Sequence, residues 1–211
     1  MGNLRRPVYF FVSCVATTVF LGSDLLGAAT YLPHQDRCVQ YHVRKKMFLV
    51  KSELVWGLNC EIAAEIQKEG DMVSVKMTIP VEKFSSGNED RDEDVKSILK
   101  YAEHPRMIFS SEKIRFESLR TALDQGGDLR VSGALKIGGK DFPVTFQVRA
   151  KREGQNIIFS GQTEVSLSHF EISPPRMLGG LVANVEDWLE LSFNVHSRHV
   201  LGVNELGIVE R

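Results

Sequence analysis

Apolar and polar residues alternate along most of the chain, most strictly over residues 129–150. In residues 129–137 the apolar side chains share one face of an extended strand, and residues 142–150 repeat this pattern. Strict alternation is typical of an antiparallel sheet with one buried face and one solvent-facing face. The sequence therefore predicts two strands around a turn at residues 137–141. It leaves open whether their apolar face encloses a packed core or a bound ligand.

The rest of the chain is also rich in short extended segments. They cover residues 39–43, 47–59, 60–66, 73–81, 106–111, 113–119, 157–168 and 188–196. Turn sequences that contain glycine or aspartate separate many of them, at residues 68–71, 124–128 and 152–156. Many short strands with such turns favour an antiparallel sandwich or barrel.

Turn positions also predict the register of the central strands. Two-residue loops at residues 139–140 and 153–154 would place Phe146 between Gly133 on one neighbouring strand and Gly161 on the other. Glycine within a strand often marks a bend or a close approach. Two interpretations stay open: the ring of Phe146 fills both gaps, or the glycines keep a channel open.

Residues 85–105 break the strand pattern and predict a single short helix. Asp92 is a candidate N-cap and Pro105 marks the end. Apolar residues follow at helical spacing, at Val95, Ile98, Leu99 and Ala102. The acidic residues at the start of this helix do not have the spacing of a calcium-binding EF-hand loop.

The N-terminus has the order of a secretory signal peptide. Arg5 and Arg6 precede an apolar run at residues 8–21, and small residues follow at 27–29. We expect a signal peptide over residues 1–29, cleaved after Ala29. The alternative is an uncleaved N-terminal anchor, although the apolar run is short for a membrane span.

Removal of this segment leaves one domain-sized chain, with a predicted domain at residues 30–199 and a C-terminal tail at 200–211. It would carry 24 basic and 26 acidic residues, a net charge of −2. The absence of a basic surplus gives no indication of nucleic acid or anionic lipid headgroups as partners. In an oxidising compartment Cys38 and Cys60 could form a disulfide. Strand parity places Cys60 inward and Cys38 outward, so the pair requires a bulge or a position of Cys38 before the strand.

Catalytic chemistry finds little support in the sequence. The histidines are scattered, at positions 34, 42, 104, 169, 196 and 199. No Ser/His/Asp arrangement, metal motif or phosphate-binding glycine loop accompanies them. We therefore expect a non-catalytic protein without a metal or cofactor.

Three segments resemble the YceI-like family. Residues 85–111 resemble its Thr-Gly-Asn, Arg-Asp, helix, Pro and Phe signature, and residues 129–148 resemble its paired strands around an Ile-x-Gly turn. Residues 163–172 are similar to its late strand. The chain differs where the family usually has His, Arg and Gly, at Asp94, Ser168 and Glu171.

The resemblance implies a periplasmic, lipocalin-like antiparallel β-barrel of about eight strands, with a helix beside or over it. Family members bind long apolar lipids such as polyisoprenoids and isoprenoid quinones in a tunnel, so a lipid of this class is the expected ligand. Strand parity predicts the lining residues Tyr41, Val43, Val75, Met77, Ile79, Leu135, Val144, Phe146 and Phe159. Arg91 and Asp92 match the family's Arg-Asp pair. We expect them to fix the loop and the helix, with a headgroup contact by Arg91 as an alternative.

A rival interpretation is an envelope interaction module whose barrel core is filled and holds no ligand. The sequence is also compatible with transient contact to a membrane or an envelope protein. It leaves open whether the chain forms a homodimer.

Overall fold

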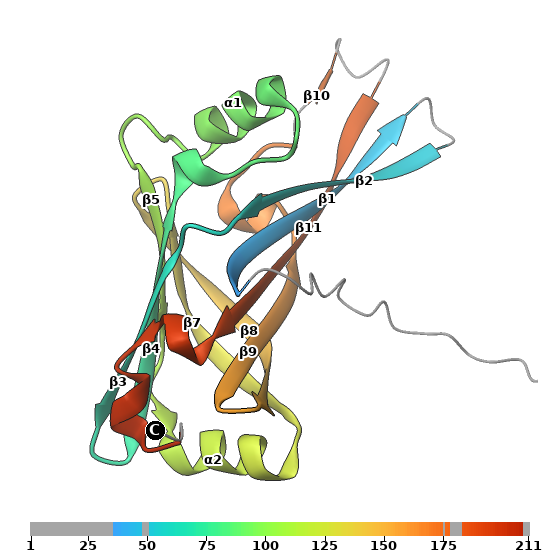
Figure 1. The fold of residues 1–211 in the computed structure, drawn as a ribbon. Coiled ribbons are helices and arrows are strands. Elements are labelled where there is room, and N and C mark those ends of the chain that lie inside the picture. The colour runs from blue at the N-terminus through green and yellow to red at the C-terminus, as the bar shows by residue number, and fades with distance from the viewer. Residues whose placement is uncertain (1–35, 48–50, 175, 178–182, 209–211) are drawn as a thin grey trace, which may run out of the picture. The chain divides into compact units, whose positions relative to one another are not determined.

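Antiparallel strands form most of the described structure, which covers residues 36–208 except 48–50, 175 and 178–182 (Figure 1). In this computed structural model all of these residues belong to one compact unit, Tyr31–Arg211. The strands are β1 (Arg37–Met47), β2 (Lys51–Asn59), β3 (Ala63–Glu69), β4 (Met72–Pro80), β5 (Arg106–Ser111), β6 (Ile114–Arg115), β7 (Asp128–Ile137), β8 (Lys140–Glu153), β9 (Asn156–Val165), β10 (Arg176–Met177), β11 (Ala183–His196) and β12 (Val200–Leu201). The predicted signal peptide lies outside the described residues.

These strands form one sheet that curls into a partly open barrel. Neighbours follow the order β12-β3-β4-β5-β7-β8-β9-β11-β1-β2, while β6 pairs with β4 and β10 with β11. β2, at one end of this order, is tied to β3, the second strand from the other end, because residues 60–62 connect the two strands directly. In addition, Leu58 of β2 exchanges two backbone hydrogen bonds of 2.9 Å with Ser85. The expected barrel-like β fold is confirmed, with ten strands on the main path of the sheet.

Two α-helices, α1 (Glu89–Ile98) and α2 (Phe116–Gln125), lie at opposite ends of the curled sheet (Figure 1). Only α1 was predicted. The expected strand over residues 113–119 is wrong beyond the short β6. Leu119, Ala122 and Leu123 are buried at helical spacing in α2, a pattern that begins inside the stretch assigned to the strand.

The start of α1 differs from the prediction by one turn. Asn88 is the N-cap, and its side-chain oxygen accepts a hydrogen bond from the backbone N–H of Arg91 at 2.9 Å. Asp92 lies within the first turns of the helix and accepts hydrogen bonds from the backbone N–H and the hydroxyl of Ser86, at 2.9 and 2.5 Å. Asp92 therefore ties the helix to the preceding loop, which is the structural role expected for it, although it is not the cap.

The predicted register is wrong by two residues in both central hairpins. Phe146 lies opposite Val131 on β7, and Gly161 on β9 lies opposite Val148 on β8. A shift of two residues leaves every side chain on its predicted face, because side chains alternate with a period of two. Phe146 therefore still points inward, but it does not lie directly between the two glycines.

The stretch after residue 199 is part of the fold. β12 pairs in parallel with β3, with Val200 opposite Ala64. Val203 and Leu206, in the short 3-10 helix that follows, are buried in a hydrophobic cluster with Leu119 of α2. Residues that the sequence analysis predicted to form a C-terminal tail thus help to close the end of the barrel that α2 covers.

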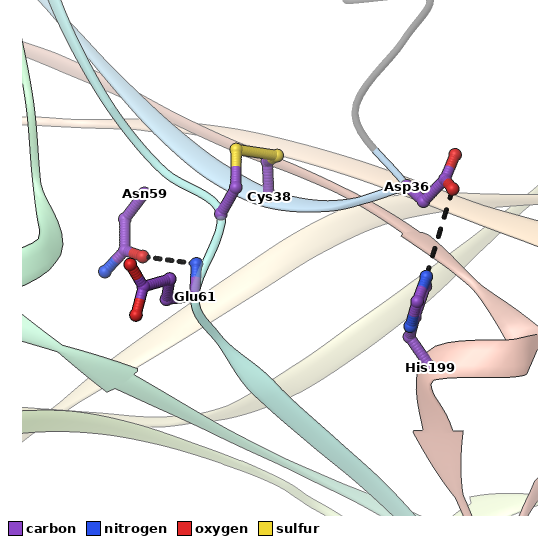
Figure 2. Close-up of a disulfide and its surroundings, with 6 residues drawn as sticks. Asp36, Cys38, Asn59, Glu61 and His199 are labelled. Carbon is purple, nitrogen blue, oxygen red and sulfur yellow. Dashed lines mark hydrogen bonds and ion pairs between the residues drawn. A yellow bond between two sulfur atoms is a disulfide. The ribbon is translucent and has the colours of Figure 1, made fainter.

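Cys38 and Cys60 form a disulfide, which joins the start of β1 to the connection between β2 and β3 (Figure 2). Cys38 does not lie before its strand, as the sequence analysis considered, but within β1. The parity argument fails at the other cysteine, because β3 begins at Ala63 and Cys60 lies in the connection rather than in a strand.

Asn59 holds the connection next to this disulfide. Its side-chain oxygen accepts a hydrogen bond from the backbone N–H of Glu61 at 2.8 Å (Figure 2), and its amide nitrogen donates one to the carbonyl of Pro80 at 2.7 Å. Asn59 is 1% exposed. Since a buried polar side chain is costly unless it is hydrogen-bonded, these bonds fix where the two ends of the sheet meet.

Candidate functional site

The barrel encloses a cavity of about 130 Å³. Side chains from nearly every barrel strand line it, together with Leu119 of α2. Among the lining residues only Gln40, Tyr41 and Ser192 carry polar side chains. A cavity this apolar does not hold water well, because water needs two to four polar partners. It is therefore suited to an apolar guest.

Three phenylalanine rings from different strands meet in the wall of this cavity. The ring of Phe146 on β8 lies edge-on to Phe109 of β5, with 5.3 Å between centroids, and to Phe193 of β11, at 5.5 Å. All three residues line the cavity. Such edge-to-face contacts stabilise aromatic clusters beyond the burial of their area.

The two strand glycines make room for this phenylalanine cluster in different ways. A Cβ atom on Gly161 would lie 2.3 Å from Cε1 and 2.4 Å from Cζ of Phe193. A Cβ atom on Gly133 would lie 2.3 Å from the backbone oxygen of Ser110 and 2.9 Å from the ring of Phe109. Gly161 thus accommodates an aromatic ring, whereas Gly133 permits the close approach of the β5 backbone. Neither gap is filled by Phe146.

Tyr41 of β1 occupies another part of the cavity wall, beside Phe84, with 5.7 Å between ring centroids. Gly57 lies opposite Tyr41 on β2, and a Cβ atom there would lie 2.3 Å from the tyrosine ring. Burial raises the pKa of Tyr41 to about 12, while Arg91 lowers it and Asp92 raises it. The start of α1 therefore brings a charged pair within electrostatic reach of the Tyr41 phenol.

Among the residues described, no cluster of His, Cys, Asp or Glu has the geometry to hold a metal ion. No helix in that part of the chain combines the length and apolar character needed to cross a membrane.

The YceI-like domain family matches residues 39–197 of the chain. This range includes all the cavity-lining residues except Val200, as well as Gly133, Gly161 and α1. The chain belongs to the YceI-like family. A comparison with curated proteins found no match.

Several solved structures share this fold. BcnA from Burkholderia cenocepacia has 21% sequence identity and a TM-score of 0.56, covering 75% of this chain and 96% of BcnA. A polyisoprenoid-binding domain from Saccharophagus degradans has 11% identity and a TM-score of 0.56, covering 75% and 92%. A YceI protein from Campylobacter jejuni has 17% identity and a TM-score of 0.50, covering 67% and 82%. At these identities the similarity establishes the fold.

The structure brings most of the predicted lining residues together around one cavity. Those that line it are Tyr41, Val75, Met77, Ile79, Leu135, Phe146 and Phe159. Val144 is buried in the core and Val43 packs against it, but neither lines the cavity. Arg91 lies near Tyr41, as its effect on the tyrosine pKa indicates.

Several lining residues were missed by the sequence analysis. Leu191, Phe193 and Val195 alternate with polar residues in β11, so their inward parity was visible in the sequence. Phe109 carried the same signal in a shorter strand. Leu119 carried no usable signal because its segment was assigned to a strand rather than to α2.

Proposed function

We propose that this protein binds a long apolar lipid of the polyisoprenoid class inside its barrel, without catalysis, and stores or carries it in the periplasm. The observation that carries the proposal is the almost wholly apolar cavity inside the barrel. The binding described for the Saccharophagus degradans domain supports the choice of ligand class. The basic, apolar and small-residue order of the N-terminus supports export.

Burial of a hydrocarbon chain supplies enough free energy for such binding. Each buried CH₂ group contributes about 0.8 kcal/mol. Ten such groups would contribute about 8 kcal/mol, from which the entropic cost of association is subtracted. The ligand therefore needs few polar contacts. We assign Tyr41 to the polar end of the lipid, because it is one of the few polar side chains that line the cavity, and Arg91 because its charge acts on the Tyr41 phenol.

The volume of the cavity limits what binds without rearrangement. A cavity of about 150 Å³ lined by similar residues in another protein holds benzene, so 130 Å³ accommodates about one isoprene unit. A longer chain requires lining side chains to move. The rings of Phe109 and Phe193 are suited to this, because each borders the cavity.

The same volume favours a second candidate function, an envelope interaction module with an essentially filled core. The two candidates differ in what the barrel holds. A carrier purified under native conditions should release a prenyl or other long-chain lipid on organic extraction, detected by mass spectrometry. It should also take up a prenyl quinone added to the delipidated protein.

A pair of neighbouring alanines on β3 provides a matched test of the site. Ala64 is buried and lines the cavity, whereas Ala63 is exposed on the opposite face of the same strand. We expect Ala64→Leu to reduce prenyl quinone uptake at least tenfold and Ala63→Leu to leave it unchanged. Uptake that Ala64→Leu leaves undiminished would place the lipid outside this cavity, and no uptake by the parent protein would favour the filled module.

A further inference from the structure

The cavity is bordered by different elements at the two ends of the barrel. At one end, Tyr41 packs against Phe84, in the segment that leads into α1. At the other end, Ile66, Val73 and Leu119 line the cavity, and Leu119 belongs to α2. The two helices lie at opposite ends of the curled sheet (Figure 1). A lipid whose polar end lies at Tyr41, as proposed above, therefore directs its tail toward α2.

Three aliphatic side chains from the last part of the described chain lie behind the lining at the α2 end. Val203, Leu206 and Ile208 are buried and belong to the same hydrophobic cluster as the lining residue Leu119. They do not line the cavity themselves. We call the segment that carries them, residues 200–208, the C-terminal plug.

The plug is attached to the cavity wall through a very short strand. β12 has two residues and pairs in parallel with β3, with Val200 opposite Ala64, and both of these residues line the cavity. Gly202 follows at a φ of +80°, and a Cβ atom there would collide with the backbone oxygen of Ile66. Glycine therefore lets the chain turn closely onto β3. Short peripheral elements of this kind open more readily than core strands.

Arg152 of β8 holds the far end of the plug. Its Nη1 donates a hydrogen bond of 2.7 Å to the backbone carbonyl of Ile208. Its Nη2 lies 3.7 Å from a carboxylate oxygen of Asp124 in α2. One side chain thus joins the barrel, the plug and α2, which together close this end of the cavity.

We propose that the C-terminal plug sets the length of the lipid tail that this protein accepts. The inference rests on the proposed function, because it concerns the tail of the same ligand in the same cavity. Protein interiors are close-packed, so a tail extends past the lining only where side chains give way. The buried side chains of Val203, Leu206 and Ile208 hold the carbon of about two isoprene units, so they exclude a stretch of tail of about that length.

The position of the plug in the chain supports this role. The match to the YceI-like family ends at residue 197, before the plug begins. The barrel strands that line the cavity, apart from β12, and α2 lie within the matched range. The limit on tail length therefore comes from a segment outside the matched domain.

The experiment titrates delipidated protein with two prenyl quinones, whose tails have one and three isoprene units. The quantity compared is the ratio of the Kd of the shorter quinone to that of the longer one. Leu206→Ala should raise this ratio at least about fivefold, because the vacated space admits further CH₂ groups of the longer tail. Glu205→Ala is the matched control, since Glu205 is exposed on the same short 3-10 helix, and it should leave the ratio unchanged.

Arg152→Met loosens the plug without removing a buried side chain. It deletes the hydrogen bond to Ile208, and because the Arg152 side chain is 45% exposed we expect the barrel to stay folded. The ratio should rise at least about twofold, with faster hydrogen exchange at the backbone N–H of Glu205, which bonds within the plug to Gly202. Arg149→Met removes an exposed arginine of the same strand, ion-paired outside the plug, and should change neither quantity.

The outcomes separate this inference from the proposed function. A ratio that neither Leu206→Ala nor Arg152→Met raises, or one that Glu205→Ala raises equally, would overturn the inference, while uptake of the shorter quinone by the parent protein would leave the proposed function standing. Arg152→Met decides the matter if Leu206→Ala does not fold. Uptake of neither quinone by the parent protein would overturn the proposed function and the inference with it.

Discussion

Gly161 offers the sharpest test of whether the cavity binds lipid. In Gly161→Ala the added methyl group would overlap Phe193, since its position is 2.3 Å from one ring carbon and 2.4 Å from the next. The ring must move, and it already borders the cavity. We expect it to swing into the cavity, which gives it space without displacing backbone.

The structure allows two effects of this substitution to be estimated, the loss of folding stability and the loss of lipid affinity. Overpacking usually costs about 1–3 kcal/mol, and an adjoining cavity favours the lower half of that range, about 1–2 kcal/mol. If the displaced ring excludes two carbons of the lipid, binding weakens by about 1.6 kcal/mol, or roughly 15-fold. Lipid affinity should therefore fall clearly while the delipidated protein stays folded.

The assays are chemical denaturation of delipidated protein and titration with a prenyl quinone. Gln162→Ala is the matched control, because Gln162 is the next residue on β9 and is exposed on the outer face. A loss of stability above about 3 kcal/mol with unchanged affinity would refute the reasoning. It would show that Phe193 is fixed core and that lipid does not enter this part of the barrel.

Three further predictions concern the fold around the cavity. Cys38→Ser/Cys60→Ser should lower the free energy of unfolding by about 3 kcal/mol, because the disulfide spans 22 residues, and a reductant should then have no further effect in urea titrations. Because the native state holds the Tyr41 proton more tightly than the unfolded chain, the stability should fall as pH rises from about 10 toward about 12. Tyr41→Phe should remove this dependence in pH-dependent unfolding. Asn88→Ala should cost about 1 kcal/mol in the same unfolding assay by removing the cap of α1, and the absence of any cost at Asn88→Ala would contradict the assignment.

Strand faces were predictable because alternation is a local property of the sequence. Met77, Leu135 and Phe146 were assigned inward from parity alone, and all three line the cavity. The register between neighbouring strands was harder to predict from the sequence. The hairpin between β7 and β8 turns at Gly138 and Gly139, both at positive φ, which suits a type I′ turn. The predicted loop one residue later would have required Lys140 in the turn.

Contacts between distant segments were the hardest to predict. Cys60 looked like a strand residue because Ile62, Ala64 and Ile66 continue its parity, and the structure buries all three. No feature of the local sequence shows that β3 begins only at Ala63. The parity argument was therefore applied to Cys60 although this residue lies outside a strand. The same holds for α2, whose buried face becomes distinct from a strand only when the stretch is considered as far as Leu123.

The cavity itself depends on a difference that no local pattern encodes. Gly133 and Gly161 look alike in sequence, each a glycine on the inward face of a strand. One lies against the backbone of β5, which cannot move without breaking its pairing, and the other lies against the ring of Phe193, which borders open space. A methyl group at Gly133 would therefore test how well the sheet tolerates a clash with the β5 backbone. One at Gly161 tests whether the Phe193 ring can move into the cavity. Whether a ligand can enter the cavity thus depends on which groups around the phenylalanine cluster can move. Only the assembled barrel determines that.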